Sequence, residues 1–183
     1  MRGQKLEPVT WDDVQQAYRR VRERFGPSPL VATEFLKRAL GPKVQLKAES
    51  MNPTGAFKIR GAYNKISCLM EQGEVESVVT ASSGNHALGV SLASNWKGIQ
   101  ATVCVPGPTP EVKKRNCANF GATVVSVGEI YDDAYTHAQE LCESEGMLYV
   151  HPVADTDVVA GQGTISLEIL EQNPEVEQVI VPL

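Results

Sequence analysis

From residue 77 onward, short runs of β-branched residues alternate with longer amphipathic segments, and this rhythm constrains the fold more than any other feature. The strand-like runs are 77–81, 101–106, 123–127 and 147–151, and the helical stretches are 87–96, 110–120, 131–143 and 158–170. Strands that alternate with helices of this length indicate βαβ units and a parallel sheet. Right-handed crossovers then place helices on both faces of the sheet. The sequence predicts an α/β protein with a three-layer sandwich.

Three further segments extend this prediction. Residues 11–25 have one-sided helical spacing, and Thr10 with Asp13 resembles an N-terminal cap. Residues 44–48 alternate like a short strand. The final run, 178–183, is typical of a buried strand, which normally leads into a loop and a covering helix. We therefore expect a fold that is incomplete at its C-terminal end.

The rhythm also suggests two lobes. We expect residues 1–76 to begin a larger domain, residues 77–150 to form a small α/β domain, and residues 151–183 to return to the larger domain. The boundaries fall near the polar segment 71–76 and near His151-Pro152.

Composition excludes several classes of protein. The net charge of −5 gives no basic face for nucleic acid, and no apolar run is long enough to cross a membrane. The first residues lack the apolar core of a signal peptide, so the expected compartment is the cytoplasm. Four cysteines and three histidines are scattered without metal-ligand spacing, and we assign no metal site.

Lys58 is the first candidate for chemistry. It follows the turn-forming sequence Pro53-Thr-Gly55, lies between Phe57 and Ile59, and precedes Arg60 by two positions. Burial and a neighbouring cation would both lower the pKa of the amine, which would then be a nucleophile toward an aldehyde. Taken alone, the pattern favours an ordinary surface lysine, because most lysines are solvated.

A second candidate is the turn Ser82-Ser83-Gly84-Asn85-His86, between the strand 77–81 and the next helix. Ligands of open α/β sheets bind at this edge, and a helix N-terminus favours an anion. The alternative is a plain Ser/Asn helix cap, which is common. A third segment, Ala160-Gly-Gln-Gly-Thr164, reads as a structural turn that opens the helix 165–170. It matches neither the dinucleotide fingerprint nor the P-loop.

Taken together and in this order, these segments resemble the serine/threonine dehydratase and serine racemase family. The resemblance rests on Asn52–Ala62, on Ser82–His86 and on Ala160–Ile165 with Leu167-Glu168. It implies the tryptophan-synthase-β-like fold, which is fold type II of the pyridoxal-phosphate enzymes.

The resemblance also implies roles for single residues. Lys58 would carry pyridoxal 5'-phosphate as a Schiff base, Phe57 would pack beside the cofactor, and Asn85 would hydrogen-bond its phenolic oxygen. Ser82, Ser83, Gly84, Asn85 and His86 would bind the substrate carboxylate. The chain departs from the family pattern in two places: Ala56 stands where serine is frequent, and the glycine run that follows the strand 178–183 in the family is absent.

The expected activity is that of an ammonia-lyase, or dehydratase, which converts L-threonine or L-serine to a 2-oxo acid and ammonia. Serine racemase is the alternative, because Ser83 occupies the position of a second acid/base. A third possibility is a truncated fragment without catalytic activity. The expected partner is a small amino acid, and the family resemblance implies a homodimer.

Overall fold

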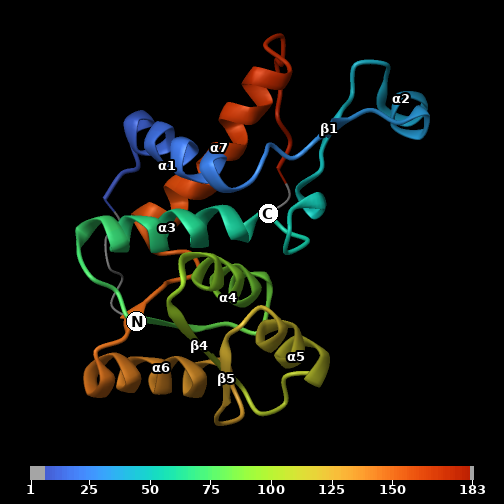
Figure 1. Ribbon diagram of the computed structural model, residues 1–183. Coiled ribbons are helices and arrows are strands. Elements are labelled where there is room, and N and C mark those ends of the chain that lie inside the picture. The colour runs from blue at the N-terminus through green and yellow to red at the C-terminus, as the bar shows by residue number, and fades with distance from the viewer. Residues whose placement is uncertain (1–6, 182–183) are drawn as a thin grey trace.

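The computed structural model describes residues 7–181 and contains one four-stranded parallel sheet and one small antiparallel pair of strands. The larger sheet has the strand order β5-β4-β3-β6 (Figure 1). Its strands are β3 (Ser77–Ala81), β4 (Gln100–Val105), β5 (Thr123–Ser126) and β6 (Leu148–Tyr149). Every ladder in it is parallel, which confirms the α/β prediction.

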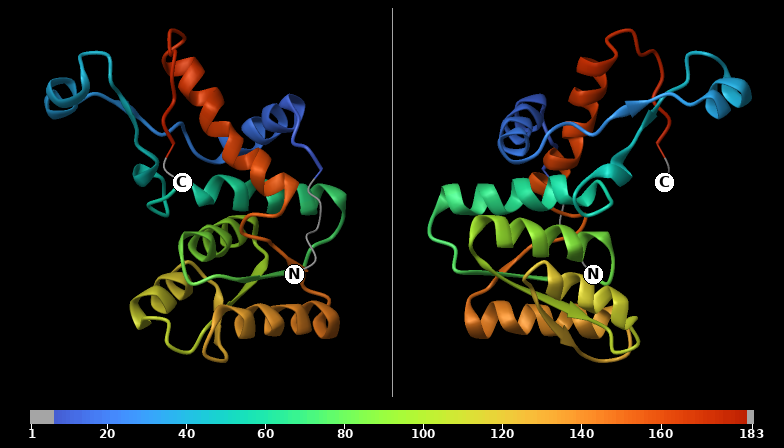
Figure 2. Two further views of the ribbon diagram at one scale, coloured as in Figure 1. Left: turned by 180° about the vertical axis from the view of Figure 1, so that it is seen from behind. Right: turned by 45° about the vertical axis from the view of Figure 1, so that its right-hand side comes forward.

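Helices cover both faces of this sheet. They are α4 (Asn85–Lys97) and α5 (Glu111–Asn119) on one face, and α6 (Tyr131–Glu145) on the other. The strand residues alternate accordingly: Val78 and Val103 pack in the core shared with α4, whereas Val79 and Cys104 pack against α6. The three-layer arrangement visible in Figure 2 is therefore the one that the sequence predicts.

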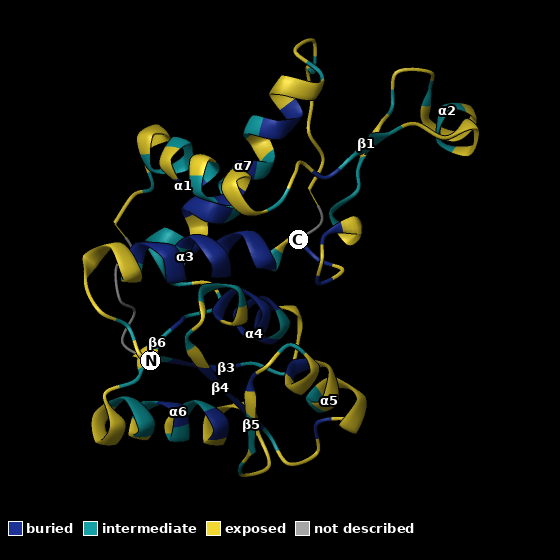
Figure 3. Ribbon diagram, in the orientation of Figure 1, coloured by how far each residue is buried: buried dark blue, intermediate teal, exposed yellow. Residues whose placement is uncertain are grey.

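A further layer of helices lies on the outer side of α4 (Figure 2). It consists of α1 (Trp11–Arg24), α3 (Lys58–Gln72) and α7 (Thr156–Gln172). The side chain of Thr10 accepts a hydrogen bond from the Asp13 amide while the Asp13 carboxylate accepts one from Thr10, so the expected cap of α1 is confirmed. Figure 3 shows that α3 and α4 are buried along much of their length.

An arm projects from this helical layer (Figures 1 and 2). It contains β1 (Leu30–Val31), α2 (Glu34–Leu40) and β2 (Leu46–Lys47), and the short 3-10 helix η1 (Glu49–Met51) follows it. The strand expected over 44–48 is thus only two residues long, and its antiparallel partner β1 was not predicted. Phe35 is 78% exposed and Leu40 67% exposed on this arm.

Two expectations are wrong. Residues 160–164 are no turn, because Asp155 caps α7 by accepting from the Val158 amide, and the helix begins at Thr156. No strand forms over 178–181, where Ile180 is 87% exposed, because no described strand pairs with this run. Residues 182 and 183 of this run lie outside the described part of the chain, as do residues 1–6, where a signal peptide would begin.

The glycines inside α7 allow a close helix crossing. A Cβ atom on Gly161 would lie 2.6 Å from Gly61 Cα and 2.7 Å from the Arg60 carbonyl oxygen. A Cβ on Gly61 would lie 2.6 Å from the Val158 carbonyl oxygen. Only glycine fits at both positions, so the two glycines bring the backbone of α7 directly against the first turns of α3.

Candidate functional site

Lys58 is the first residue of α3 and follows a tight turn. The Gly55 amide donates to the Asn52 carbonyl at 2.8 Å, and Gly55 has a φ of 72°, a conformation that glycine adopts readily. The Lys58 amine is half-buried and donates to the Pro152 carbonyl at 2.9 Å. It also lies 5.2 Å from the centre of the Phe57 ring. Burial lowers the pKa of this amine, as the sequence predicts.

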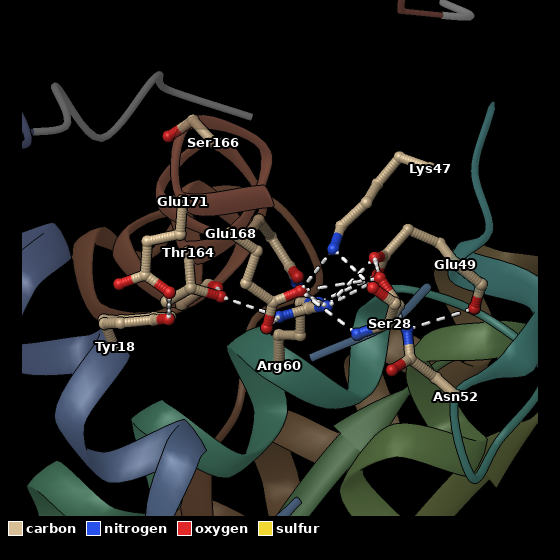
Figure 4. Close-up of polar contacts among 12 residues, drawn as sticks. Tyr18, Ser28, Lys47, Glu49, Asn52, Arg60, Thr164, Ser166, Glu168 and Glu171 are labelled. Atoms are coloured by element: carbon tan, nitrogen blue, oxygen red, sulfur yellow. Dashed lines mark hydrogen bonds and ion pairs between the residues drawn. The ribbon is translucent and has the colours of Figure 1, made fainter. Parts of the chain in front are cut away.

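The second expected cause of that shift is wrong. Arg60 extends into a buried cluster, where its guanidinium hydrogen-bonds Glu49 and Glu168 (Figure 4). Its charge is therefore balanced, and burial alone lowers the pKa of Lys58. The sequence could not show this arrangement, because Glu168 lies 108 positions away.

The Ser82–His86 turn lies at the N-terminus of α4. Gly84 is the N-cap residue, and no side chain caps the helix among the described residues. The plain Ser/Asn cap considered from the sequence is therefore wrong. The first amides of a helix have no intrahelical acceptor, and the helix dipole adds a partial positive charge. The exposed Asn85 and the half-buried Ser83 lie at this end.

Two residues of the turn, Ser82 and His86, offer fewer free groups to an anion than the sequence predicts. The Ser82 amide already donates to the Cys104 carbonyl at 3.2 Å. His86 is 3% exposed, and its Nε2 hydrogen-bonds the Val150 carbonyl at 3.0 Å. Burial lowers the pKa of His86 to about 4, with a smaller contribution from the charge of Lys58. This imidazole is therefore neutral near pH 7, and only the backbone of His86 remains available to a ligand at the turn.

The exit of β6 joins the two candidate segments. Thr80 and His86 both donate to the Val150 carbonyl, and Lys58 donates to the Pro152 carbonyl two residues later. In addition, a Cβ on Gly89 of α4 would lie 3.1 Å from the Lys58 carbonyl oxygen. The structure thus brings Lys58 and the turn before α4 together, although 24 positions or more separate them in the sequence.

Residues 150–152 are the part of the site that sequence reasoning missed. They act through backbone carbonyls, which no side-chain motif reveals. His151 itself folds the following turn, since its Nδ1 accepts from the amides of Val153 and Ala154. The sequence signal that could have found this segment is its place at the end of a parallel strand.

A family model described as "Pyridoxal-phosphate dependent enzyme" matches residues 21–183. This chain belongs to that family. The L-threonine ammonia-lyase of Thermotoga maritima is 43% identical over 175 residues, which are 96% of this chain and 44% of that protein. The catabolic L-threonine dehydratase TdcB of Escherichia coli is 38% identical over 96% of this chain and 54% of its own length.

Solved structures of the pyridoxal-phosphate family are similar as well. Maize serine racemase superposes with a TM-score of 0.87 at 32% identity, over 92% of this chain and 51% of that chain. A pyridoxal 5'-phosphate-dependent aspartate racemase has a TM-score of 0.85 at 38% identity, over 93% of this chain and 53% of that chain. The chain spans about half the length of the curated relatives that it matches.

Two cavities lie near the helices of this family member. One of about 120 Å³ is lined by Ser83, Gly84 and Asn85 together with Thr109 and Lys113 of the next crossover. A larger polar cavity of about 200 Å³ lies among α1, α3 and α7, and none of the predicted site residues lines it. The smaller cavity therefore belongs to the candidate site. No helix in the described range is long and apolar enough to span a membrane.

Proposed function

We propose that this chain supplies the lysine-bearing part of a pyridoxal-phosphate-dependent ammonia-lyase that acts on L-threonine or L-serine. The observation that carries the proposal is the Lys58 amine, which is half-buried, has a lowered pKa and lies beside the uncapped helix turn. The threonine ammonia-lyases among the relatives support this choice of reaction.

The residues present fit the cofactor. Among the described residues, the Lys58 amine donates to a single carbonyl and lies beside an aromatic ring, which suits an aldehyde on a flat heterocycle. When bound, pyridoxal phosphate supplies an electron sink that makes the substrate Cα proton easier to remove. We assign Phe57 to packing against the cofactor ring and the Asn85 amide to its phenolic oxygen.

Lys58 has two tasks in this proposal. In its neutral form the amine would hold the cofactor through its aldehyde group and, when free of it, would accept the Cα proton as general base. The pKa lowered by burial favours both tasks, because both need the uncharged amine. The amides at the turn, with the Ser83 hydroxyl, hold the substrate carboxylate against the positive end of α4. We further assign residues 77–150 to a small domain and the segments 1–76 and 151–183 to a larger one.

The test is covalent trapping of the cofactor. Pyridoxal phosphate is added to the purified chain, the visible absorption of lysine-bound cofactor is recorded, borohydride reduces the adduct, and mass spectrometry locates it. We expect the adduct on Lys58 and its loss in Lys58→Ala. Lys65→Ala is the matched control, because Lys65 lies two turns along the same helix and is paired with Asp155 and Asp157. An absent adduct, or one spread evenly over the lysines, would favour the non-catalytic fragment instead.

Racemisation is the second candidate. The Ser83 hydroxyl forms no hydrogen bond to another described residue, so it is available as a second acid/base, and two similar structures are racemases. Chiral chromatography of the amino acid recovered after incubation with L-serine tests this role. D-serine above background that disappears in Ser83→Ala supports it, and D-serine at background level excludes it.

We also propose a homodimer. The exposed apolar residues of the arm, Phe35 and Leu40, are the surface that supports an association. Sedimentation of the wild-type chain and of Phe35→Ser checks it, with a monomer in both as the contradicting result.

A further inference from the structure

Lys58 and Arg60 lie on opposite sides of the same helical turn. Successive residues of an α-helix are about 100° apart, so residues two positions apart point in nearly opposite directions. The Lys58 amine contacts Pro152, at the exit of β6. Arg60 is 0% exposed and points back toward α7 and the segment that leads into α3 (Figure 4).

The Arg60 guanidinium is held from two directions by carboxylates. Nη1 and Nη2 donate to the two oxygens of Glu168 at 2.7 Å each, and Nε and Nη2 donate to the two oxygens of Glu49 at 2.8 and 2.9 Å. Thr164 and Ser28 accept two further hydrogen bonds at 3.2 Å. A planar fork with two bidentate partners leaves its side chain a single orientation.

The partners of Arg60 are themselves fixed. Glu168 of α7 has a fully buried side chain and accepts a hydrogen bond from Lys47 of β2 at 2.6 Å. The Glu49 carboxylate accepts a hydrogen bond at 2.6 Å from the side-chain Nδ2 of Asn52, which lies at the beginning of the turn that leads to Lys58. One end of this network therefore belongs to α7, and the other belongs to the turn that leads into α3.

We propose that Arg60 is a positioning residue for Lys58. By clamping α3 between Glu168 and Glu49, it fixes the rotation of the first helical turn, so that the Lys58 amine stays at Pro152 and away from solvent. The close contact between Gly61 and Gly161 limits sliding of the same turn along the axis of α3. The value of this position for cofactor binding rests on the proposed function, whereas the position itself does not.

A merely structural network would stabilise the fold without affecting the chemistry of Lys58. The two cases differ in the reactivity of the lysine. If the first turn is released, the amine reaches water, and its pKa returns toward the ordinary value of lysine. Asp155 caps α7 close to His86 on α4 and His151 after β6, and burial lowers the pKa of both histidines. Both imidazoles are neutral above about pH 7 and do not change charge in the range where lysine titrates.

The test measures Lys58 without any cofactor. Competitive acetylation with acetic anhydride is followed by mass spectrometry across the alkaline range, on the wild-type chain and on Arg60→Lys. This variant keeps the charge but loses the fork. We expect the pKa of Lys58 to rise toward the ordinary value and its labelling near pH 7 to fall, because a higher pKa leaves a smaller fraction of the amine neutral.

Arg20→Lys is the matched control. Arg20 also makes a bidentate pair, with Glu71 at the other end of α3, at 2.7 and 2.6 Å. Its replacement should leave the labelling of Lys58 unchanged. If Lys58 reacts identically in folded wild-type and Arg60→Lys chains, Arg60 has only a structural role and the proposal is overturned.

Glu49→Gln is the second variant and decides the matter if Arg60→Lys does not fold. Its side chain is 17% exposed, so the change is milder than one at Glu168. Loss of a carboxylate acts electrostatically to lower a lysine pKa, so a rise can come only from the released turn. An unchanged or lowered pKa of Lys58 in folded Glu49→Gln contradicts the proposal.

The two proposals fail separately. Labelling that depends on Arg60, without trapping of pyridoxal phosphate on the wild-type chain, would retain the positioning role and reject the proposed function. Trapping of pyridoxal phosphate on Lys58, with labelling that does not depend on Arg60, would retain the proposed function and reject the positioning role.

Discussion

The two sides of the first turn of α3 differ in how completely their polar groups are paired. On the side of Arg60, every guanidinium nitrogen donates to a carboxylate, and all four carboxylate oxygens of Glu49 and Glu168 accept. On the side of Lys58, the Pro152 carbonyl is the one described partner of the amine, so the other hydrogen-bonding positions of that nitrogen are unpaired. A saturated network can only hold structure, whereas unpaired groups are free to bind. The comparison therefore separates the part of the helix that supports from the part that is available for chemistry.

The largest effect is expected from removing the buried cation. Arg60→Met leaves Glu168 and Glu49 facing each other in the interior, with Lys47 as the remaining cation. Breaking a buried ion pair from one side costs about 3–5 kcal/mol. Urea denaturation measures the loss. Arg20→Met, at the partly exposed pair with Glu71, should cost less than about 1 kcal/mol, and equal losses would contradict the comparison.

The interactions on the Lys58 side and on the Arg60 side of α3 should lose their contribution to stability in different ranges of acid pH. Burial lowers the pKa of His86 to about 4, so the unfolded chain binds a proton more readily and stability falls as the pH drops from about 6.5 to about 4. The loss amounts to roughly 3 kcal/mol. Urea midpoints at several pH values measure it. In His86→Gln this slope should become much smaller, with the part due to His151 remaining, whereas His137→Gln on α6 should retain the full slope.

The Arg60 side responds only to stronger acid. Burial acts to raise the pKa of Glu168, but the hydrogen bonds from Arg60 and Lys47 outweigh it and hold the pKa below its ordinary value. Its stabilisation is thus complete above about pH 4.5 and is lost as the pH falls through the lowered pKa. Glu168→Gln should remove this acid step and leave the His86 slope in place.

A smaller effect is expected at the helix crossing that supports both sides. Gly161→Ala places a methyl group 2.6 Å from a backbone atom of α3, and such overpacking costs about 1–3 kcal/mol. Thermal unfolding measures it. Gly163→Ala is the control on the same helix, because the atoms nearest its methyl group would belong to the Val14 side chain, the closest at 3.0 Å, and not to the backbone of α3. A Gly161→Ala chain as stable as the control would show that the crossing can relax.

The smallest effect on stability is expected at the lysine itself. Lys58→Met keeps the apolar stem and removes one hydrogen bond to Pro152 together with a partly desolvated charge. The free energy of unfolding should change by less than about 1 kcal/mol. The same substitution should abolish borohydride trapping of pyridoxal phosphate. A large destabilisation would show that Lys58, like Arg60, mainly stabilises the fold.

The sequence predicts those elements of the structure that depend on residues close together in the chain. The strand and helix rhythm after Ser77, the cap at Thr10 and the sharp turn before Lys58 all follow from short-range preferences. The position of Arg60 does not follow from local patterns, because no periodicity brings its partners Glu49 and Glu168 together. Gly161 was read as a turn, although a glycine inside a helix can instead mark a close crossing. The run 178–181 has strand-forming residues, but a strand also requires a partner, and the described chain offers none.

The Pro152 carbonyl gives the site an internal reporter. It accepts its hydrogen bond from the amine that is proposed to react with an aldehyde, so a covalent bond at that nitrogen changes the electron density on this oxygen. A ¹³C label at the carbonyl carbon of Pro152 would register occupancy of the lysine by its chemical shift. Thr80 and His86 hold the neighbouring Val150 carbonyl, which provides a reference nucleus two residues away.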